Sequence, residues 1–118
     1  MSKTVSIHPY FKIHPGKIDE AKALLPKMIE VTATEEACLW YDFSIGGDVL
    51  HCREAYVGGE GLLTHLGNVD ALIQEMLKIS DLIRVEVHGP ADELEKVKEP
   101  LAPLNPEYYE FICGLGKP

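Results

Sequence analysis

The sequence predicts an α+β fold in which an antiparallel sheet is covered by helices on one face. Residues 4–13 alternate in polarity with the two-residue period of a strand, whereas residues 17–32 repeat apolar side chains at helical spacing. A pair of alternating runs follows, and then come a further helical region and another strand. The order strand, helix, strand, strand, helix, strand is the split β-α-β arrangement of ferredoxin-like folds.

The first strand and helix each contain a proline that is expected to disturb them. Pro9 lies inside the strand at residues 4–13 and has no amide hydrogen, so we expect the strand to be bulged, irregular or at a sheet edge there. Residues 14–16 form a turn before the helix at residues 17–32. Pro26 removes a backbone donor from this helix and predicts a kink.

The middle of the chain predicts a hairpin followed by helices. The hairpin strands are the alternating runs at residues 39–45 and 49–57, which flank a Gly-Gly-Asp turn. The glycine-rich segment 58–61 is expected to break the chain before a short helix around residues 62–66. Asn68 is a good N-cap residue, so a separate helix is expected to begin there.

The C-terminal quarter predicts one strand, one short helix and a last strand. The strand is expected at residues 82–88 and the charged helix at residues 92–99. Prolines recur at every third residue from 100 to 106, which indicates an extended connector to a last strand at residues 108–113. We therefore expect residues 1–118 to form a single domain, with residues 89–118 as a C-terminal extension.

Charge and composition exclude several classes of partner. Nineteen acidic side chains against eleven basic ones give a net charge of −8, which argues against a nucleic-acid partner. The chain has no apolar run of the ~20 residues that span a membrane and no apolar signal segment at its start, so no membrane partner and a cytoplasmic location are expected. Cys38, Cys52 and Cys113 have no CxxC spacing, and we expect reduced thiols that fill the core.

The second hairpin strand indicates that two copies of the chain pair. Apolar side chains occur on both of its faces: Val49, Ala55 and Val57 on one, and Leu50, Cys52 and Tyr56 on the other. A sheet that is covered by helices on one face and is still apolar on the other needs a second cover. A second copy related by a two-fold axis is the simplest cover, so a homodimer is expected.

Four short segments, taken in order, resemble the antibiotic biosynthesis monooxygenase family of dimeric α+β barrels. They are His14-Pro15-Gly16-Lys17, Glu35-Glu36-Ala37-Cys38-Leu39-Trp40-Tyr41, Arg53-Glu54-Ala55-Tyr56 and Thr64-His65-Leu66. The resemblance spans Val5 to Val87 and implies a dimer with one pocket per chain between sheet and helices. It also implies oxidation of a small phenolic, quinol or polyketide-type aromatic molecule by dioxygen, with no bound cofactor or metal.

Two departures from the family pattern keep other functions open. Asp70 stands where many members carry a second histidine, and no histidine occurs between Leu66 and Val87, which argues against the haem-degrading branch. Other dimeric α+β barrels are isomerases or have no demonstrated chemistry. A non-catalytic binding or interaction module and an isomerase of a small ring compound therefore remain alternatives.

His65 is the candidate catalytic residue. It shares a helical face with Leu62, Leu66 and Val69, so its side chain is expected to point inward. It is either a core histidine bonded to the backbone or the base that accepts the proton of a phenolic hydroxyl. The candidate substrate-binding residues are His8, Trp40, Tyr41, His51, Arg53 and Tyr56.

Each binding candidate has a structural alternative. Arg53 would orient a phenolate through a bidentate contact or pair with an acidic neighbour, and Glu54 is expected to be structural. The aromatic rings would line a pocket for a flat ligand or fill the core. His8, His51 and His88 could meet in the sheet, but no HxH, HExxH or CxxC spacing indicates a metal site.

Overall fold

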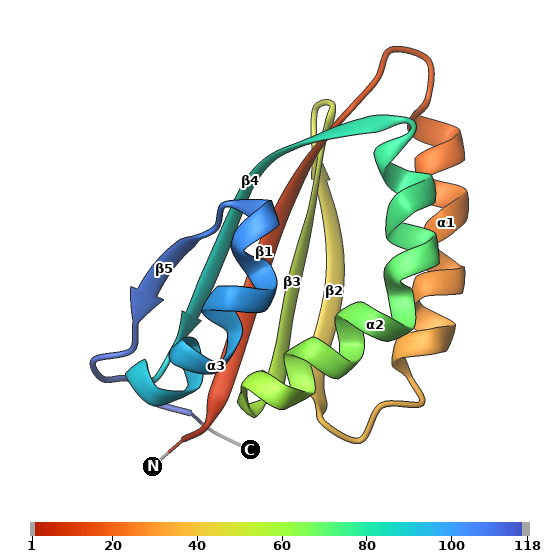
Figure 1. The fold of residues 1–118 in the computed structure, drawn as a ribbon. Helices are drawn as coiled ribbons and strands as arrows, with labels where there is room; N and C mark the ends of the chain where they lie inside the picture. The colour runs from red at the N-terminus through yellow and green to blue at the C-terminus, as the bar shows by residue number, and fades with distance from the viewer. Residues whose placement is uncertain (1, 117–118) are drawn as a thin grey trace.

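The computed structural model describes residues 2–116 and contains a five-stranded sheet with three α-helices packed on one face (Figure 1). The elements are β1 (Thr4–Ile13), α1 (Ile18–Thr32), β2 (Cys38–Gly46), β3 (Val49–Val57), α2 (Gly58–Leu77), β4 (Ser80–Gly89), α3 (Ala91–Leu101), the 3₁₀ turn η1 (Ala102–Leu104) and β5 (Glu107–Glu110). The strand order is β2-β3-β1-β4-β5. All neighbouring strands are antiparallel except β4 and β5, so the sheet is mixed. The predicted α+β, ferredoxin-like arrangement is confirmed.

In β1, the side chains that face the helices are the apolar set that the alternation predicts. Val5 and Ile7 are 0% and 2% exposed and face the helices. Pro9 lies in the central strand of the sheet and not at an edge. The pairing of β1 with β4 shifts register between Tyr10 and Phe11, directly after the proline, so the predicted irregularity is present.

The prediction of a glycine break and two helices is wrong, because α2 is one continuous helix of 20 residues. The glycines permit close packing. A Cβ atom on Gly59 would lie 2.9 Å from the backbone oxygen of Glu93, and one on Gly61 would lie 2.9 Å from the Cβ atom of Ala37. Among the described residues, no helix is long and apolar enough to span a membrane.

Three further predictions need correction. Asn68 lies in the middle of α2 and does not cap it; its side-chain amide donates to Glu35. Pro100 lies inside α3, because burial of the apolar face of this helix outweighs the missing backbone hydrogen bond. The last strand ends at Glu110 and not at residue 113, since only residues 107–110 pair with β4.

The cysteines differ in burial. Cys52 is buried and Cys38 is partly buried, as expected of core residues, but Cys113 is exposed. Cys113 therefore does not fill the core. All three thiols are free.

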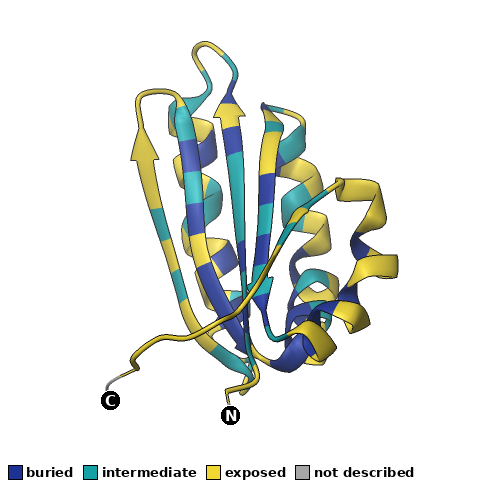
Figure 2. Cartoon of the chain, turned by 90° about the vertical axis from the view of Figure 1, so that its left-hand side faces the viewer, coloured by how far each residue is buried: buried dark blue, intermediate teal, exposed yellow. Residues whose placement is uncertain are grey.

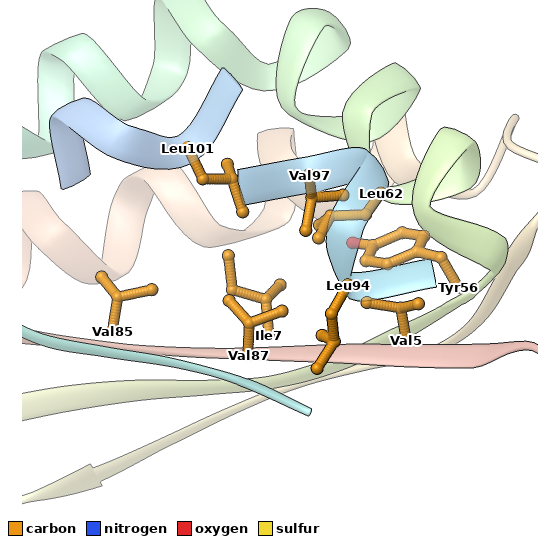
Figure 3. Packing of buried hydrophobic residues seen from close by; sticks show 9 residues of the cluster. All are labelled: Val5, Ile7, Tyr56, Leu62, Val85, Val87, Leu94, Val97 and Leu101. Carbon is orange, nitrogen blue, oxygen red and sulfur yellow. The ribbon is translucent and has the colours of Figure 1, made fainter. Parts of the chain in front are cut away.

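The extension after β4 contributes to the main hydrophobic core. Leu94, Val97 and Leu101 of α3 point towards the side chains that rise from the sheet (Figure 3). The nine residues of this cluster are Val5, Ile7, Tyr56, Leu62, Val85, Val87, Leu94, Val97 and Leu101. The extension is thus an integral part of the domain.

The opposite face of the sheet, called the open face below, carries no helix among the described residues (Figure 2). A row of rings crosses it from β3 to β5. The ring centroids of His51 and His8 lie 5.8 Å apart, those of His8 and His88 5.0 Å, and those of His88 and Tyr109 4.7 Å. The segment 111–116 passes over one end of this face (Figure 2).

Candidate functional site

A cavity of about 240 Å³ lies between the sheet and the helices. Its lining comes from β1 to β4, from α1 and α2, and from the α3–η1 segment. Most of the lining is apolar, and Glu54, His65, Asp70 and Gln74 bring the charged or strongly polar side chains. A mostly apolar hollow with a few polar groups is the usual form of a small-molecule site.

His65 is held between two carboxyl groups on this cavity. It lies on the buried side of α2, and its side chain is 1% exposed. Nδ1 of His65 is 3.0 Å from Oε1 of Glu35, in the connection between α1 and β2, and Nε2 is 3.2 Å from Oε1 of Glu54 on β3. The side chains of Glu35 and Glu54 are 5% and 6% exposed. We call these three side chains the Glu35–His65–Glu54 group.

The contacts of His65 set which ring nitrogen can accept a proton. A neutral imidazole donates one hydrogen bond and accepts one, whereas an ionised carboxylate only accepts. Nδ1 lies 3.0 and 3.2 Å from the two carboxylate oxygens of Glu35, which accept a hydrogen bond from the tautomer that carries its proton on Nδ1. That tautomer leaves the lone pair of Nε2 beside Glu54, so the group can take up a proton at Nε2.

Polar neighbours fix the two carboxyl groups. The hydroxyl of Tyr56 donates to Oε1 of Glu54 at 2.6 Å, and the side-chain amide of Asn68 donates to Oε2 of Glu35 at 3.1 Å. Burial, followed by the negative charge of Glu54, raises the pKa of Tyr56, so its hydroxyl keeps the proton that it donates. Each carboxyl group is therefore held in one orientation towards the imidazole.

Two more side chains complete the wall near His65. The ring of Tyr41 meets that of His65 edge-on, with 5.0 Å between the centroids. Burial, followed by the charge of Glu54, raises the pKa of Tyr41, which stays a neutral phenol. Burial also raises the pKa of Cys52, so its thiol is not an activated nucleophile.

The structure brings three of the seven predicted site residues together. His65 and Tyr41 line the cavity, and Tyr56 donates to Glu54 and has its ring centroid 4.8 Å from that of His65. The other four, His8, Trp40, His51 and Arg53, do not line this cavity.

These four residues lie on the open face, because successive side chains of a strand point to opposite sides of a sheet. His51 and Arg53 alternate along β3 with Cys52 and Glu54, which face the cavity. The guanidinium of Arg53 lies 3.8 Å from a carboxylate oxygen of Asp42 and 5.4 Å from the ring centroid of Trp40. The pairing of Arg53 with an acidic neighbour, the structural alternative, is the one that the structure contains.

The rings of His8, His51 and His88 lie next to one another on the open face but do not form a metal site. Burial lowers the pKa of His8, and the charges of His88 and His51 lower it further; burial also lowers the pKa of His51. Within residues 2–116, no three His, Cys, Asp or Glu side chains are arranged to hold a metal ion.

Sequence reasoning missed Glu35 and the role of Glu54. The sequence position of Glu54 indicates a buried, paired carboxyl group. Glu54 lies on the same face of the strand as Leu50, Cys52 and Tyr56, and a lone charge on an apolar face needs a partner. Glu35 carried no such signal, since it lies in a connection and meets His65 only in the folded chain.

Solved structures of known proteins share all or most of the fold. MupZ from Pseudomonas fluorescens is 38% identical, with a TM-score of 0.94 over 99% of this chain and 97% of MupZ. A Caulobacter crescentus protein described as an antibiotic biosynthesis monooxygenase is 20% identical, with a TM-score of 0.66 over 73% of this chain and 88% of its own. A second protein of that description is 19% identical, with a TM-score of 0.62 over 70% and 92%. The chain belongs to the same family as MupZ and has the fold of the antibiotic biosynthesis monooxygenases. No protein-family model and no curated protein matches the sequence.

The antibiotic biosynthesis monooxygenases of low identity match only part of the chain. They cover 70% to 75% of it, although 88% to 93% of their own length is matched. The unmatched part is therefore additional in this chain, and its size corresponds to the segment after β4. MupZ, which covers 99% of the chain, shares the extension.

Proposed function

We propose that the chain is an enzyme that removes a proton from a small, largely apolar substrate and passes it to the Glu35–His65–Glu54 group. The observation that supports this most is the buried imidazole between two carboxyl groups on the wall of an apolar cavity. An imidazole oriented by a carboxylate is an effective general base near neutral pH. Here the carboxylates also stabilise the charge that the imidazole gains.

The fold shared with the antibiotic biosynthesis monooxygenases, together with the sequence resemblance to them, favours oxidation of a phenol or quinol as the reaction that follows. His65 accepts the proton, Glu54 and Glu35 orient the imidazole, and Tyr41 packs against the aromatic ring. The deprotonated substrate is rich in electrons and itself reduces dioxygen. With an anthrone, the ring methylene becomes a carbonyl: one oxygen atom enters the product, and the other leaves as water with the two methylene hydrogens.

A second candidate is an isomerisation, and Asp70 is the observation that favours it. Asp70 lies on the same cavity but outside the Glu35–His65–Glu54 group, so two separate proton-active groups face a bound molecule. One of them takes a proton from the substrate while the other returns one at a different atom. This reaction consumes no dioxygen.

We also propose that the chain works as a homodimer joined through the open face. Large apolar side chains are exposed on or near that face: Trp40 is 38% exposed, Ile112 90% and Leu115 84%. A second copy would cover them. Sedimentation is expected to give twice the mass of one chain, and a clean monomer at micromolar concentration would contradict the dimer.

Oxygen uptake tests the proposed chemistry. Hydroquinones and anthrone are offered to the wild type, to His65→Ala and to His14→Ala, a matched control whose imidazole lies on an exposed turn beside Asp81. Loss of the general base is expected to lower uptake by about 10² to 10⁴-fold in His65→Ala alone. Equal uptake by His65→Ala and the wild type would remove the assignment. Conversion without uptake would favour the isomerase, and tight binding without conversion would indicate a binding module.

A further inference from the structure

We propose that the α3–η1 segment, residues 91–104, is the binding wall for a hydrocarbon tail, so that the substrate joins a hydroxyl-bearing head to an aliphatic chain. The assignment of the head rests on the proposed function. The assignment of the tail rests on the cavity lining and can be tested by binding alone.

The cavity wall that this segment forms contains no side-chain hydrogen-bonding group. Pro100, Leu101, Pro103 and Leu104 line the same cavity as Glu54 and His65. Proline has no amide hydrogen, and neither proline nor leucine has a polar side-chain atom. A polar group of a ligand that lay against this wall would lose its bonds to water without replacement, at a cost in binding.

The wall and the proton-transfer group lie at different ends of the cavity. Glu54 is on β3, whereas Val85, which lines the cavity below the extension, is on β4. β1 separates these two strands in the sheet. Neighbouring strands are ~4.8 Å apart, so roughly 10 Å separates the two ends. Ile7 and Pro9 of β1 line the cavity between them, and a ligand that reaches both ends therefore needs an apolar middle.

Buried contacts of α3 anchor the wall to the core. The buried side chain of Glu93 accepts the amide hydrogen of Gly59 at 2.9 Å and is 3.1 Å from Nζ of Lys96. Leu94 and Val97 are 3% and 0% exposed and point into the core cluster (Figure 3). Leu104 is 37% exposed and lies at the rim, where a longer chain would leave the cavity.

Calorimetric titration with 4-alkylphenols, from methyl to octyl, tests the wall. Affinity for the wild type is expected to rise by about fourfold per added methylene until the chain reaches the rim. In Leu104→Ser, the gain in affinity from the methylenes at the far end of the alkyl chain is expected to disappear. In Leu104→Trp, the alkyl chain that binds most tightly is expected to be shorter than in the wild type. Leu39→Ser, at an exposed leucine that does not line this cavity, is expected to match the wild type.

Two results would contradict the proposed binding wall. One is equal affinity of the wild type for all the alkylphenols, and the other is the same gain per methylene in both Leu104 variants as in the wild type. Glu54→Gln separates this result from the proposed function, because it is expected to lose turnover and to keep the gain per methylene. Binding that grows with chain length, without turnover of any phenol, would support the wall and contradict the proposed function. Thermal unfolding of each variant confirms that it is folded.

Discussion

Both faces of the sheet carry histidines, but their surroundings differ. On the helix-covered face, His65 is 1% exposed, and each ring nitrogen meets a carboxyl group within 3.2 Å. On the open face, His8 lies between two other imidazole rings, His51 and His88, and its Nε2 pairs with the hydroxyl of Ser6 at 3.0 Å.

The difference shows that partners, and not residue type, decide what a histidine can do. Carboxyl groups contact both ring nitrogens of His65 and orient the imidazole, as a general base requires. On the open face, burial and then the neighbouring imidazoles lower the pKa of His8. We therefore expect variants on the helix-covered face to change turnover, and matched variants on the open face to leave it unchanged.

The largest effect is expected from matched glutamates on the two faces. Glu54→Gln removes the carboxylate beside Nε2 of His65 and is expected to lower turnover by about 100-fold or more. Glu86→Gln removes a carboxylate that lies 3.2 Å from Nε2 of His88 on the open face and is expected to keep turnover. Steady-state rates with the most active phenol or quinol make the comparison, and equal losses in both variants would remove the distinction between the faces.

The next effect concerns the packing of α3 on α2. In Gly59→Ala the new methyl group would lie 2.9 Å from the backbone oxygen of Glu93, which is expected to cost about 1 to 3 kcal/mol of the free energy of unfolding. Gly67→Ala, in the same helix, meets no atom within 4 Å and is expected to stabilise the protein by about 0.5 to 1 kcal/mol. Urea unfolding measures both, and a neutral Gly59→Ala would show that the extension packs more loosely.

A smaller effect is expected from two tyrosines that each bind the glutamate two residues earlier. Tyr56→Phe removes a buried bond to Glu54 and is expected to cost about 1 kcal/mol of unfolding free energy and about tenfold in turnover. Tyr109→Phe removes an exposed bond to Glu107 and is expected to change neither measurably. Because Tyr56 acts through Glu54, an unchanged pH profile of turnover in Tyr56→Phe would count against its positioning role.

The smallest effect is the pH dependence of stability from the open face. Burial, His88 and His51 lower the pKa of His8, whereas Glu86 and Glu54 act in the other direction. Below pH 6.5 the unfolded chain then binds a proton at His8 that the folded chain does not bind. The free energy of unfolding therefore decreases as the pH is lowered, until the pH passes the pKa of His8 in the folded chain. Urea unfolding at pH 7.5 and 5.5 is expected to show a smaller fall for His8→Asn than for the wild type; an equal fall would contradict this.

The sequence predicted what depends on neighbouring residues in the chain. Alternation identifies the buried parity of β1, and helical spacing places His65 inward, because both patterns repeat within one element. The glycines before His65 were misinterpreted, since their role depends on Ala37 and Glu93, which are distant in the sequence. Glu35 was missed for the same reason. The faces of β2 and β3 were ambiguous, because apolar and polar side chains occur on both parities.

The most direct test of the proton-transfer group is hydrogen exchange of the anthrone methylene in deuterated water without oxygen. Anthrone is incubated with the wild type, with His65→Ala and with His88→Ala, and deuterium incorporation is followed by mass spectrometry. We expect the wild type and His88→Ala to exchange the methylene hydrogens about 100-fold or more faster than His65→Ala. Exchange that is equally fast with His65→Ala would contradict the account, because the proton would then leave by a route that does not use the Glu35–His65–Glu54 group.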